Sequence, residues 1–284
     1  MLNFSLSDDQ IALRDMVRKF VQQDIIPNAA KFDESGDFPK EIINKAWELG
    51  LMNIAIPEKF GGMGLGIIED VVISEELGAG CLGMTTSIAV NTLALYPILI
   101  GGTEAQIEEF AVPFLSSPKL AAFCLTEPGS GSDAGSLSTM AKEEGDHFVV
   151  NGSKMWITNA GHAELFTVFC TTNKDLKTKG IICLVIPANT PGISLGKHEN
   201  KLGQRCSDTR ALTFENVRVP KKNMIGKFGE GFKIAMRTLD RTRTPIAAGA
   251  VGAARSAMTY AKNYSKERKQ FGQPIANFQA IQFM

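Results

Sequence analysis

The chain has 284 residues, a length typical of about two domains. Hydrophobic residues make up 44% of the sequence and charged residues 21%, both near the averages of globular proteins, which excludes disordered and fibrous classes. The 30 Lys and Arg residues balance the 30 Asp and Glu residues. The sequence therefore lacks the basic excess with which nucleic-acid binders neutralise phosphates, and we predict no nucleic-acid partner.

Cysteine and histidine usage predicts neither a disulfide framework nor a metal site. The five cysteines are widely spaced and form no CxxC pair, and no two of the three histidines stand at metal-ligand spacing. We expect free thiols in a reducing compartment. The N-terminal MLNFSLSDDQ resembles neither a secretory signal nor a transit peptide, which favours a cytoplasmic location. The apolar stretch over 87–100 is interrupted by Asn91, Thr92 and Pro97, and we predict no membrane span.

The first third of the sequence has helical periodicity. Capping boxes are expected at Ser7–Gln10 and Thr103–Gln106, and Pro27 is expected to end the first helical run. The helical segments cover residues 7–26, 39–49, 67–77, 85–99 and 103–115. The glycine cluster over 61–66 lacks the Lys-Ser/Thr of a phosphate-binding loop, so we interpret it as a structural loop between helices.

The pattern changes after Pro118. Short runs rich in β-branched and aromatic residues follow, separated by Gly, Asn, Asp and Pro. These runs are 120–125, 147–150, 166–171, 181–186 and 212–214. Their spacing predicts a β-sandwich or barrel and argues against alternating βαβ units.

Helical periodicity returns near Gly229 and continues to Tyr264, with a kink or restart expected at Pro245. A turn at 272–274 precedes the start of another helix at Ile275. We therefore predict an α+β multidomain fold: an N-terminal helical domain (1–118), a middle β domain (119–228) and the start of a C-terminal helical bundle (229–284). Because such bundles usually have four helices, we expect about 60–100 further residues in a complete protein.

Two segments carry the most chemistry. Residues 124–133, CLTEPGSGSD, join a strand end to a Gly/Ser loop whose backbone amides can approach a pyrophosphate or a flat heterocycle. Residues 154–159, KMWITN, present an indole and a hydroxyl two residues apart, on one side of a strand. From chemistry alone, a structural turn with a core tryptophan is as good an interpretation as a cofactor site.

In combination, these segments resemble the acyl-CoA dehydrogenase family. The first fits its signature of small, aliphatic, Ser/Thr and Glu followed by small, Gly, Ser/Thr and Asp, with Ser136 three residues on. The segments KMWITN, GQRCSDTR (203–210) and ERKQFG (267–272) match in the family order. The resemblance spans the whole chain and is greatest to the medium- and short-chain branch, with the C-terminal part of the bundle missing. It implies a helical domain, a β domain and a four-helix bundle.

The resemblance implies FAD and acyl-CoA sites. Trp156 would stack near the flavin ring, Thr158 would hydrogen-bond near N5, and Arg268 and Phe271 would contact the FAD of a neighbouring subunit. The implied FAD-binding residues are Phe123, Leu125, Thr126, Gly131, Ser132, Trp156, Ile157, Thr158, Arg268, Phe271 and Gln279. The implied acyl-CoA-binding residues are Ser132, Asp240 and Arg243. Arg243 and Arg268 could instead be surface cations, Asp133 a turn cap and Glu127 structural.

The implied reaction is α,β-dehydrogenation of an acyl-CoA thioester. A carboxylate removes the α-proton while hydride leaves Cβ for flavin N5, and electrons pass to an electron-transfer flavoprotein. The family's usual glutamate base lies late in the bundle, and the isovaleryl and long-chain enzymes place it where this chain has Thr242. No residue of this chain matches either position, so we expect an oxidoreductase of fatty-acid β-oxidation whose 284-residue chain alone is inactive.

The resemblance also implies a homotetramer or dimer when the protein is complete. Two alternatives stay open. One is a related acyl-CoA oxidase-type flavoenzyme, and the other is a non-catalytic, truncated protein that binds FAD and CoA.

Overall fold

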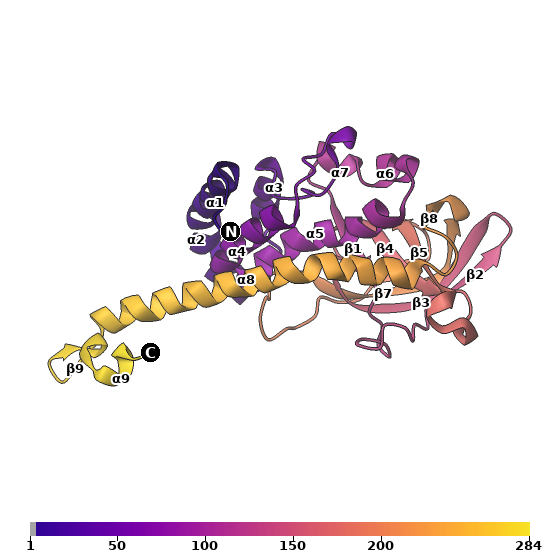
Figure 1. Cartoon of the computed structure of the whole chain (residues 1–284). Coiled ribbons are helices and arrows are strands. Elements are labelled where there is room, and N and C mark those ends of the chain that lie inside the picture. The colour runs from indigo at the N-terminus through magenta and orange to yellow at the C-terminus, as the bar shows by residue number, and fades with distance from the viewer. Residues whose placement is uncertain (1–3) are drawn as a thin grey trace.

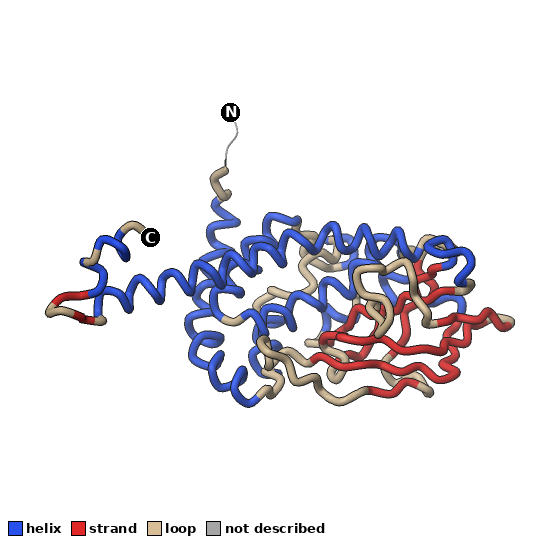
Figure 2. Tube along the Cα trace, turned by 90° about the horizontal axis from the view of Figure 1, so that it is seen from below, coloured by secondary structure: helices blue, strands red, loops and turns tan. Residues whose placement is uncertain are grey.

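The computed structural model describes residues 4–284 and has helices at one end and a β-sheet at the other, with one long helix running along both (Figures 1 and 2). This arrangement confirms the predicted fold class. The helices before the sheet are α1 (Asp8–Phe20), α2 (Ile26–Ser35), α3 (Lys40–Glu48), α4 (Ile67–Gly80), α5 (Leu82–Gly101), α6 (Glu104–Phe110) and α7 (Pro113–Ser116).

The two predicted capping boxes are present. The Ser7 hydroxyl accepts from the Gln10 N–H at 3.3 Å while the Gln10 amide oxygen accepts from the Ser7 N–H, and Thr103 and Gln106 pair in the same way. The expectation that Pro27 ends the first run was wrong. The chain continues through a π-helical turn (Val21–Ile25) into α2, where Pro27 occupies the first turn and removes an N–H that needs no helical partner.

The glycine cluster packs as a structural loop. The Gly64 N–H donates to the Ile56 carbonyl at 2.9 Å, and a Cβ on Gly62 would lie 2.0 Å from the same oxygen. Gly61 and Gly64 have φ angles of 83° and 59°, which side chains rarely adopt. The glycines therefore allow a tight turn between α3 and α4.

The strands form one hydrogen-bonded network in the order β6-β7-β3-β2-β4-β5-β8, with β1 parallel to β4. Their bounds are β1 (Leu120–Cys124), β2 (Met140–Glu144), β3 (His147–Thr158), β4 (Ala163–Thr171), β5 (Ile181–Pro187), β6 (Ile193–Leu195), β7 (Thr209–Pro220) and β8 (Met224–Ile225). Phe148 of β3, Phe214 of β7, Phe166 of β4 and Leu184 of β5 share one buried cluster. The two halves of the network therefore enclose a common core, as in a sandwich.

The helix α8 (Gly231–Glu267) has 37 residues and continues through Pro245 without interruption, so the helix does not restart at this proline. Its N-terminal part packs on the sheet and α5, where Ile234 and Ala235 belong to the core cluster between helices and strands. Its middle part, around Gly252, packs on α4. Arg255 ties α8 to α4 through ion pairs with Glu75 at 2.6 Å and Glu76 at 3.0 Å.

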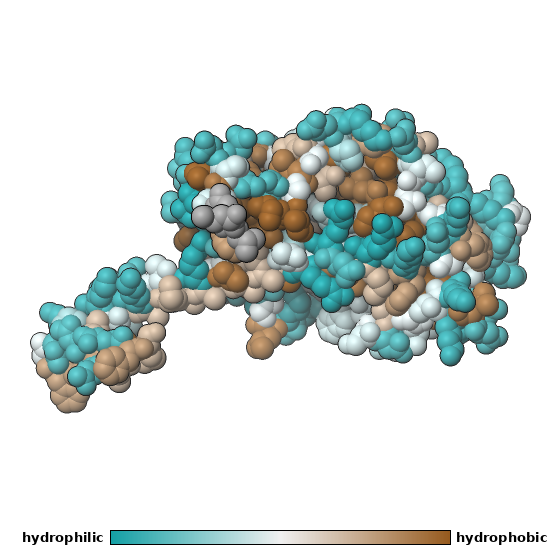
Figure 3. Space-filling view, viewed as in Figure 1, coloured by the Kyte–Doolittle hydropathy of each residue, from teal (hydrophilic) through white to brown (hydrophobic). Residues whose placement is uncertain are grey.

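The distal end of α8 projects from the rest of the molecule, followed by a small tail (Figures 1 and 2). The tail contains β9 (Lys269–Gln270), β10 (Gln273–Pro274), a 3-10 turn (Ile275–Asn277) and α9 (Gln279–Gln282). On the projecting end of α8 and the tail, apolar and polar surfaces alternate (Figure 3). The exposed large apolar side chains there include Tyr264 of α8 and Phe271 and Phe283 of the tail. Within the described residues, this part of the helix has no packing partner comparable to α4.

One helix, α5, meets the length and composition criteria for a membrane span, and no other helix in residues 4–284 does. Its apolar window is 67% buried inside the fold. Ala94, Leu95 and Ile98 lie in the core cluster with residues of the sheet. The position of α5 is thus that of a core helix.

Candidate functional site

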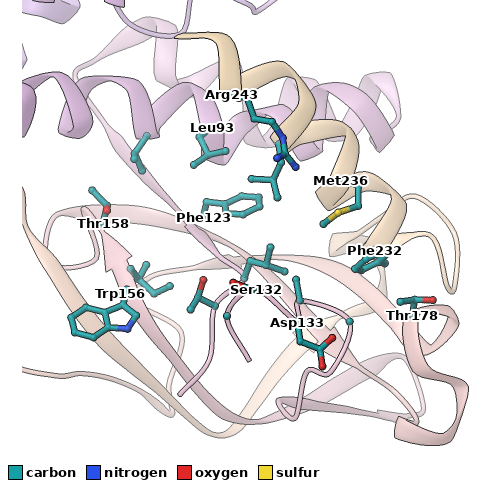
Figure 4. A pocket seen from close by; sticks show the side chains of 18 residues that line it. Leu93, Phe123, Ser132, Asp133, Trp156, Thr158, Thr178, Phe232, Met236 and Arg243 are labelled. Carbon is teal, nitrogen blue, oxygen red and sulfur yellow. The ribbon is translucent and has the colours of Figure 1, made fainter. Parts of the chain in front are cut away.

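A cavity of about 560 Å³ lies between the sheet, α5 and α8 (Figure 4). It brings together most of the residues predicted to bind FAD, from β1, the loop after it and the end of β3. Trp156 and Thr158 lie at one end, and Phe232 and Thr178 lie at the other. The lining residues are Val90, Leu93, Phe123, Leu125, Thr126, Gly131, Ser132, Asp133, Ala134, Gly135, Trp156, Ile157, Thr158, Thr178, Phe232, Met236, Leu239 and Arg243.

The loop after β1 begins with a tight turn in which Glu127 and Ser130 exchange backbone hydrogen bonds of 2.9 and 3.1 Å. A Cβ on Gly131 would meet nothing within 4 Å, so the backbone is open to a ligand. In the part of the chain that the structure describes, the N–H groups of Ser132 and Ala134 have no acceptor in the protein. Unpaired amides beside an open glycine suit an anionic or heterocyclic ligand.

The end of β3 is irregular where the signature tryptophan lies. Its pairing with β7 shifts between Lys154 and Ile157, and Trp156 has a φ of 61°. The simple alternation that we used to place Trp156 and Thr158 on one side of a strand therefore does not hold here. Both side chains nevertheless line the cavity, and the indole is 54% exposed. The bulge turns Trp156 outward, where it can pack on a ligand.

Behind the loop, Glu127 and Lys154 form a fully buried ion pair. The Lys154 ammonium donates to the Glu127 carboxylate at 2.7 Å and to the Leu125 carbonyl at 3.1 Å. The other Glu127 oxygen accepts from the N–H and hydroxyl of Ser138, both at 2.6 Å. Burial raises the pKa of Glu127, but the Lys154 charge and these hydrogen bonds outweigh it and lower the pKa to about 2. The pair fixes the loop to β3, in keeping with a structural Glu127.

This lowered pKa predicts acid sensitivity. Because the folded-state pKa of about 2 lies below the ordinary value of 4.5, the stabilisation is present above pH 4.5 and is lost as pH falls toward 2. We expect the difference in unfolding free energy between wild type and Glu127→Gln to shrink by up to about 3 kcal/mol over that range. Urea denaturation at successive pH values measures it. A difference that stays constant with pH would contradict the assignment.

The opposite wall of the cavity comes from α8. Arg243 and Met236 reach toward Phe123 (Figure 4), and Leu239 of the same helix also lines the cavity. The Asp240 Oδ1 lies 3.7 Å from the Arg243 Nε, so the two side chains share one face of α8. Asp240, however, lines a neighbouring cavity with Arg237 and Arg241. The structure therefore places the two predicted acyl-CoA contacts at the boundary between two cavities.

The predicted FAD contacts Arg268, Phe271 and Gln279 are not part of this cavity. All three are exposed in the tail beyond α8, and the Phe271 ring lies edge to face with Phe278, at 6.2 Å between centroids. The expected contacts of Arg268 and Phe271 with the FAD of a neighbouring subunit involve a surface outside a single chain. Their assignment therefore stays a prediction.

The cavity offers little for proton abstraction. Asp133 is the sole carboxylate among its described lining residues. It is exposed and accepts a hydrogen bond from the Ser136 hydroxyl at 2.5 Å. Thr242 donates to the Thr238 carbonyl at 3.2 Å and is not a lining residue. In residues 4–284 no group of three or more His, Cys, Asp or Glu side chains could hold a metal ion.

Several lining residues escaped the sequence analysis. Phe232, Met236 and Leu239 recur at helical spacing, but nothing in the sequence says that the face they form covers the cavity. Thr178 comes from the 3-10 segment Lys174–Gly180 between β4 and β5 and has no sequence signal. The Glu127–Lys154 pair joins the two motifs, and only the fold brings them together.

Comparison with known proteins gives three domain matches. The chain matches the family models of the acyl-CoA dehydrogenase N-terminal domain over residues 7–117, the middle domain over 122–217 and the C-terminal domain over 229–284. It is 44% identical over 286 residues to the probable medium-chain specific acyl-CoA dehydrogenase 2, mitochondrial, of Caenorhabditis briggsae, covering 100% of this chain and 70% of that protein.

Solved structures agree. The butyryl-CoA dehydrogenase of Megasphaera elsdenii superposes with a TM-score of 0.96 at 38% identity, over 99% of this chain and 75% of that one. A glutaryl-CoA dehydrogenase from Mycobacterium smegmatis in complex with FADH2 gives 0.90 at 30% identity, over 98% and 70%. Full coverage by a relative of this identity, together with the shared fold and the three domain matches, shows that the chain belongs to the acyl-CoA dehydrogenase family, flavoprotein oxidoreductases of fatty-acid metabolism.

Proposed function

We propose that the chain binds FAD and an acyl-CoA thioester in the cavity between the sheet and α8, for α,β-dehydrogenation of the thioester. The observation that carries the proposal is the convergence, in one cavity, of the loop 126–135, the bulged end of β3 and Arg243 of α8. These segments are far apart in the sequence. Their convergence fits the family resemblance of the motifs.

The lining residues suit FAD. The open backbone around Gly131 and the unpaired amides beside it would meet polar groups of the cofactor. Trp156 would pack on the flavin ring, and the Thr126 and Thr158 hydroxyls would hydrogen-bond to its polar edge. The remaining lining positions assigned to FAD are Phe123, Leu125, Ser132 and Ile157. When bound, FAD accepts the hydride that leaves the thioester.

The α8 side of the cavity suits the thioester. The apolar side chains Leu93, Met236 and Leu239 would exclude water from its acyl chain. Arg243 and Asp240, at the boundary between two cavities, would contact the CoA portion, and Ser132 would hydrogen-bond near the thioester. The chain would thus orient the CoA portion through charged side chains and the acyl portion through apolar ones.

The residues that line the cavity supply no base for this reaction. An α-proton is weakly acidic, and its removal requires a carboxylate shielded from water with a raised pKa. Asp133 is exposed and holds the Ser136 hydroxyl, and threonine occupies position 242. We therefore propose that the 284-residue chain binds both ligands without turnover.

A reconstitution experiment tests these proposals. After incubation with FAD and gel filtration, the protein should retain visible flavin absorbance, and Trp156→Ala should retain much less. Addition of butyryl-CoA should leave the bound flavin oxidised. A colourless wild-type protein would contradict the cofactor assignment, whereas flavin bleaching by butyryl-CoA would contradict only the absence of a base.

Arg243→Ala tests the substrate wall in the same preparation. Loss of a charge-assisted contact should weaken butyryl-CoA binding about tenfold, measured by titration calorimetry, with flavin content unchanged. Lys233→Ala is the matched control, because Lys233 is an exposed cation of α8 that lines neither cavity. Equal weakening in both variants would indicate a general charge effect.

Further properties follow from family membership and from the sequence. We propose an electron-transfer flavoprotein as the electron acceptor, and a homo-oligomer in which Arg268 and Phe271 contact a neighbouring subunit's FAD. Gln279 is a further proposed FAD contact. The boundaries 1–118, 119–228 and 229–284 are proposed domain limits. The cytoplasmic location stays a prediction of the sequence.

A further inference from the structure

Two cysteines outside the cavity meet where α5 begins. Cys81 is the N-cap residue of α5, and Cys206 lies in the loop before β7. Cys206 is 1% exposed, and the half-buried Cys81 packs against the cluster that contains it. The Cys206 sulfur lies directly over the first turn of α5, since a Cβ on Gly83 would come within 2.7 Å of it.

The two thiols differ in acidity because of this contact. The hydrogen bond from the Cys206 thiol has the largest effect on the pKa of Cys81 and lowers it. The Met84 and Gly83 N–H groups at the helix N-terminus lower it further, while burial and the Asp33 charge raise it. The resulting pKa is about 6. In turn, the neighbouring Cys81 raises the pKa of Cys206. The lowered pKa favours a Cys81 thiolate that accepts a hydrogen bond from the Cys206 thiol. Thiolates of low pKa at helix N-termini are the reactive class of cysteine.

The other three cysteines provide an internal contrast. Cys124, Cys170 and Cys183 are fully buried, and burial raises the pKa of each thiol. Buried thiols of raised pKa are inert toward oxidants. Cys81, half-buried and with a lowered pKa, is the one cysteine of the described residues that combines access with increased nucleophilicity.

Polar contacts already hold the two elements together. Thr86 donates to the Gln204 side-chain oxygen at 2.7 Å, and the Ser87 and Ser207 hydroxyls are 3.2 Å apart. These contacts flank Cys206 on both sides. The same loop borders a second cavity with Trp156 and Thr158, so a covalent link here would fix the loop beside the proposed flavin.

We propose that Cys81 is a peroxide-sensitive modification site, with Cys206 as its resolving thiol. The Cys81 thiolate attacks hydrogen peroxide; the O–O bond breaks, giving a sulfenic acid on Cys81 and hydroxide. The Cys206 sulfur then displaces the hydroxyl of the sulfenic acid, forming an S–S bond and water as its proton leaves. Together the thiolate and the thiol lose two electrons, and one peroxide is reduced to one hydroxide and one water. A dithiol reductant reverses the link.

Peptide mapping of the intact 284-residue protein tests the proposal. After reduction, removal of reductant and exposure to hydrogen peroxide, we expect a Cys81–Cys206 cross-linked peptide that disappears with dithiothreitol. Cys206→Ser should instead accumulate sulfenic acid at Cys81, captured by dimedone, and Cys170→Ala should behave as wild type. A Cys81 sulfenic acid without the cross-link in wild type would overturn the role of Cys206. Absence of both products would overturn the proposal.

Alkylation kinetics give a second readout that does not depend on peroxide. At pH 7, iodoacetamide should label Cys81 at least about tenfold faster than Cys124, Cys170 or Cys183. Cys206→Ala should shift the pH midpoint of Cys81 labelling upward, because the hydrogen-bond donor that stabilises the thiolate is lost. An unchanged midpoint, or labelling of Cys81 no faster than that of the buried cysteines, would contradict the pairing.

Discussion

Replacing Lys154 with methionine is expected to lower the free energy of unfolding by about 3–5 kcal/mol. The substitution removes the ammonium from a pair in which both side chains are 0% exposed and leaves the Glu127 carboxylate buried without its counter-charge. It also leaves the Leu125 carbonyl without the Lys154 donor. Because Glu127 anchors the loop at Ser138 and Thr139, the loop beside the cavity should loosen as well. Urea denaturation measures the first effect, and flavin retention after reconstitution measures the second.

Two variants separate this cause from a general loss of charge. Lys142→Met removes one partner of an exposed pair with Glu144 on the edge of β2 and should change stability by less than about 1 kcal/mol. Combining Glu127→Gln with Lys154→Met removes both charges and should recover part of the loss, because no uncompensated charge remains. If Lys154→Met were no more costly than Lys142→Met, the buried pair would have no special weight.

Local signals in the sequence were sufficient for most helices. The capping boxes at Ser7 and Thr103 depend on residues within one turn, and the structure has both. The prediction at Pro27 was wrong because a proline in the first turn of a helix and a proline that ends a helix have the same local sequence signal. The strand β2, MAKEE, was missed because its side chains are mostly polar and only Ala141 is fully buried. Its pairing with β3 depends on the sheet and not on its own composition.

The candidate site was likewise predictable from the sequence only in part. The loop 126–135 and the segment around Trp156 were identified from their motifs, and they line one cavity. The bulge at Trp156 was not predictable, because a φ of 61° for a tryptophan is imposed by pairing with β7. The wall formed by α8 depends on how that helix crosses α4, which is a property of two segments nearly 180 residues apart. The crossing therefore controls whether the cavity has its second wall.

Gly252→Ala should disrupt that crossing. A Cβ on Gly252 would lie 1.9 Å from the Glu75 carbonyl oxygen and 2.9 Å from the Ala79 nitrogen, and backbone atoms of a packed helix cannot move aside. We expect a loss of at least about 3 kcal/mol in unfolding free energy. Separation of α8 from α4 would also displace Met236, Leu239 and Arg243 from the cavity. Thermal unfolding and butyryl-CoA binding measure the two effects.

Gly249→Ala is the matched control, one turn earlier on the same helix. The nearest atom to its Cβ would be the Ser74 carbonyl oxygen at 3.6 Å, an ordinary contact. Alanine also favours a helix over glycine by about 1 kcal/mol, so this variant should unfold no more easily than wild type. The opposite responses of two glycines three residues apart follow only if α4 and α8 touch at the carbonyl of Glu75. If both variants were equally stable, α8 would not pack on α4 as described, and the α8 wall of the cavity would lose its support.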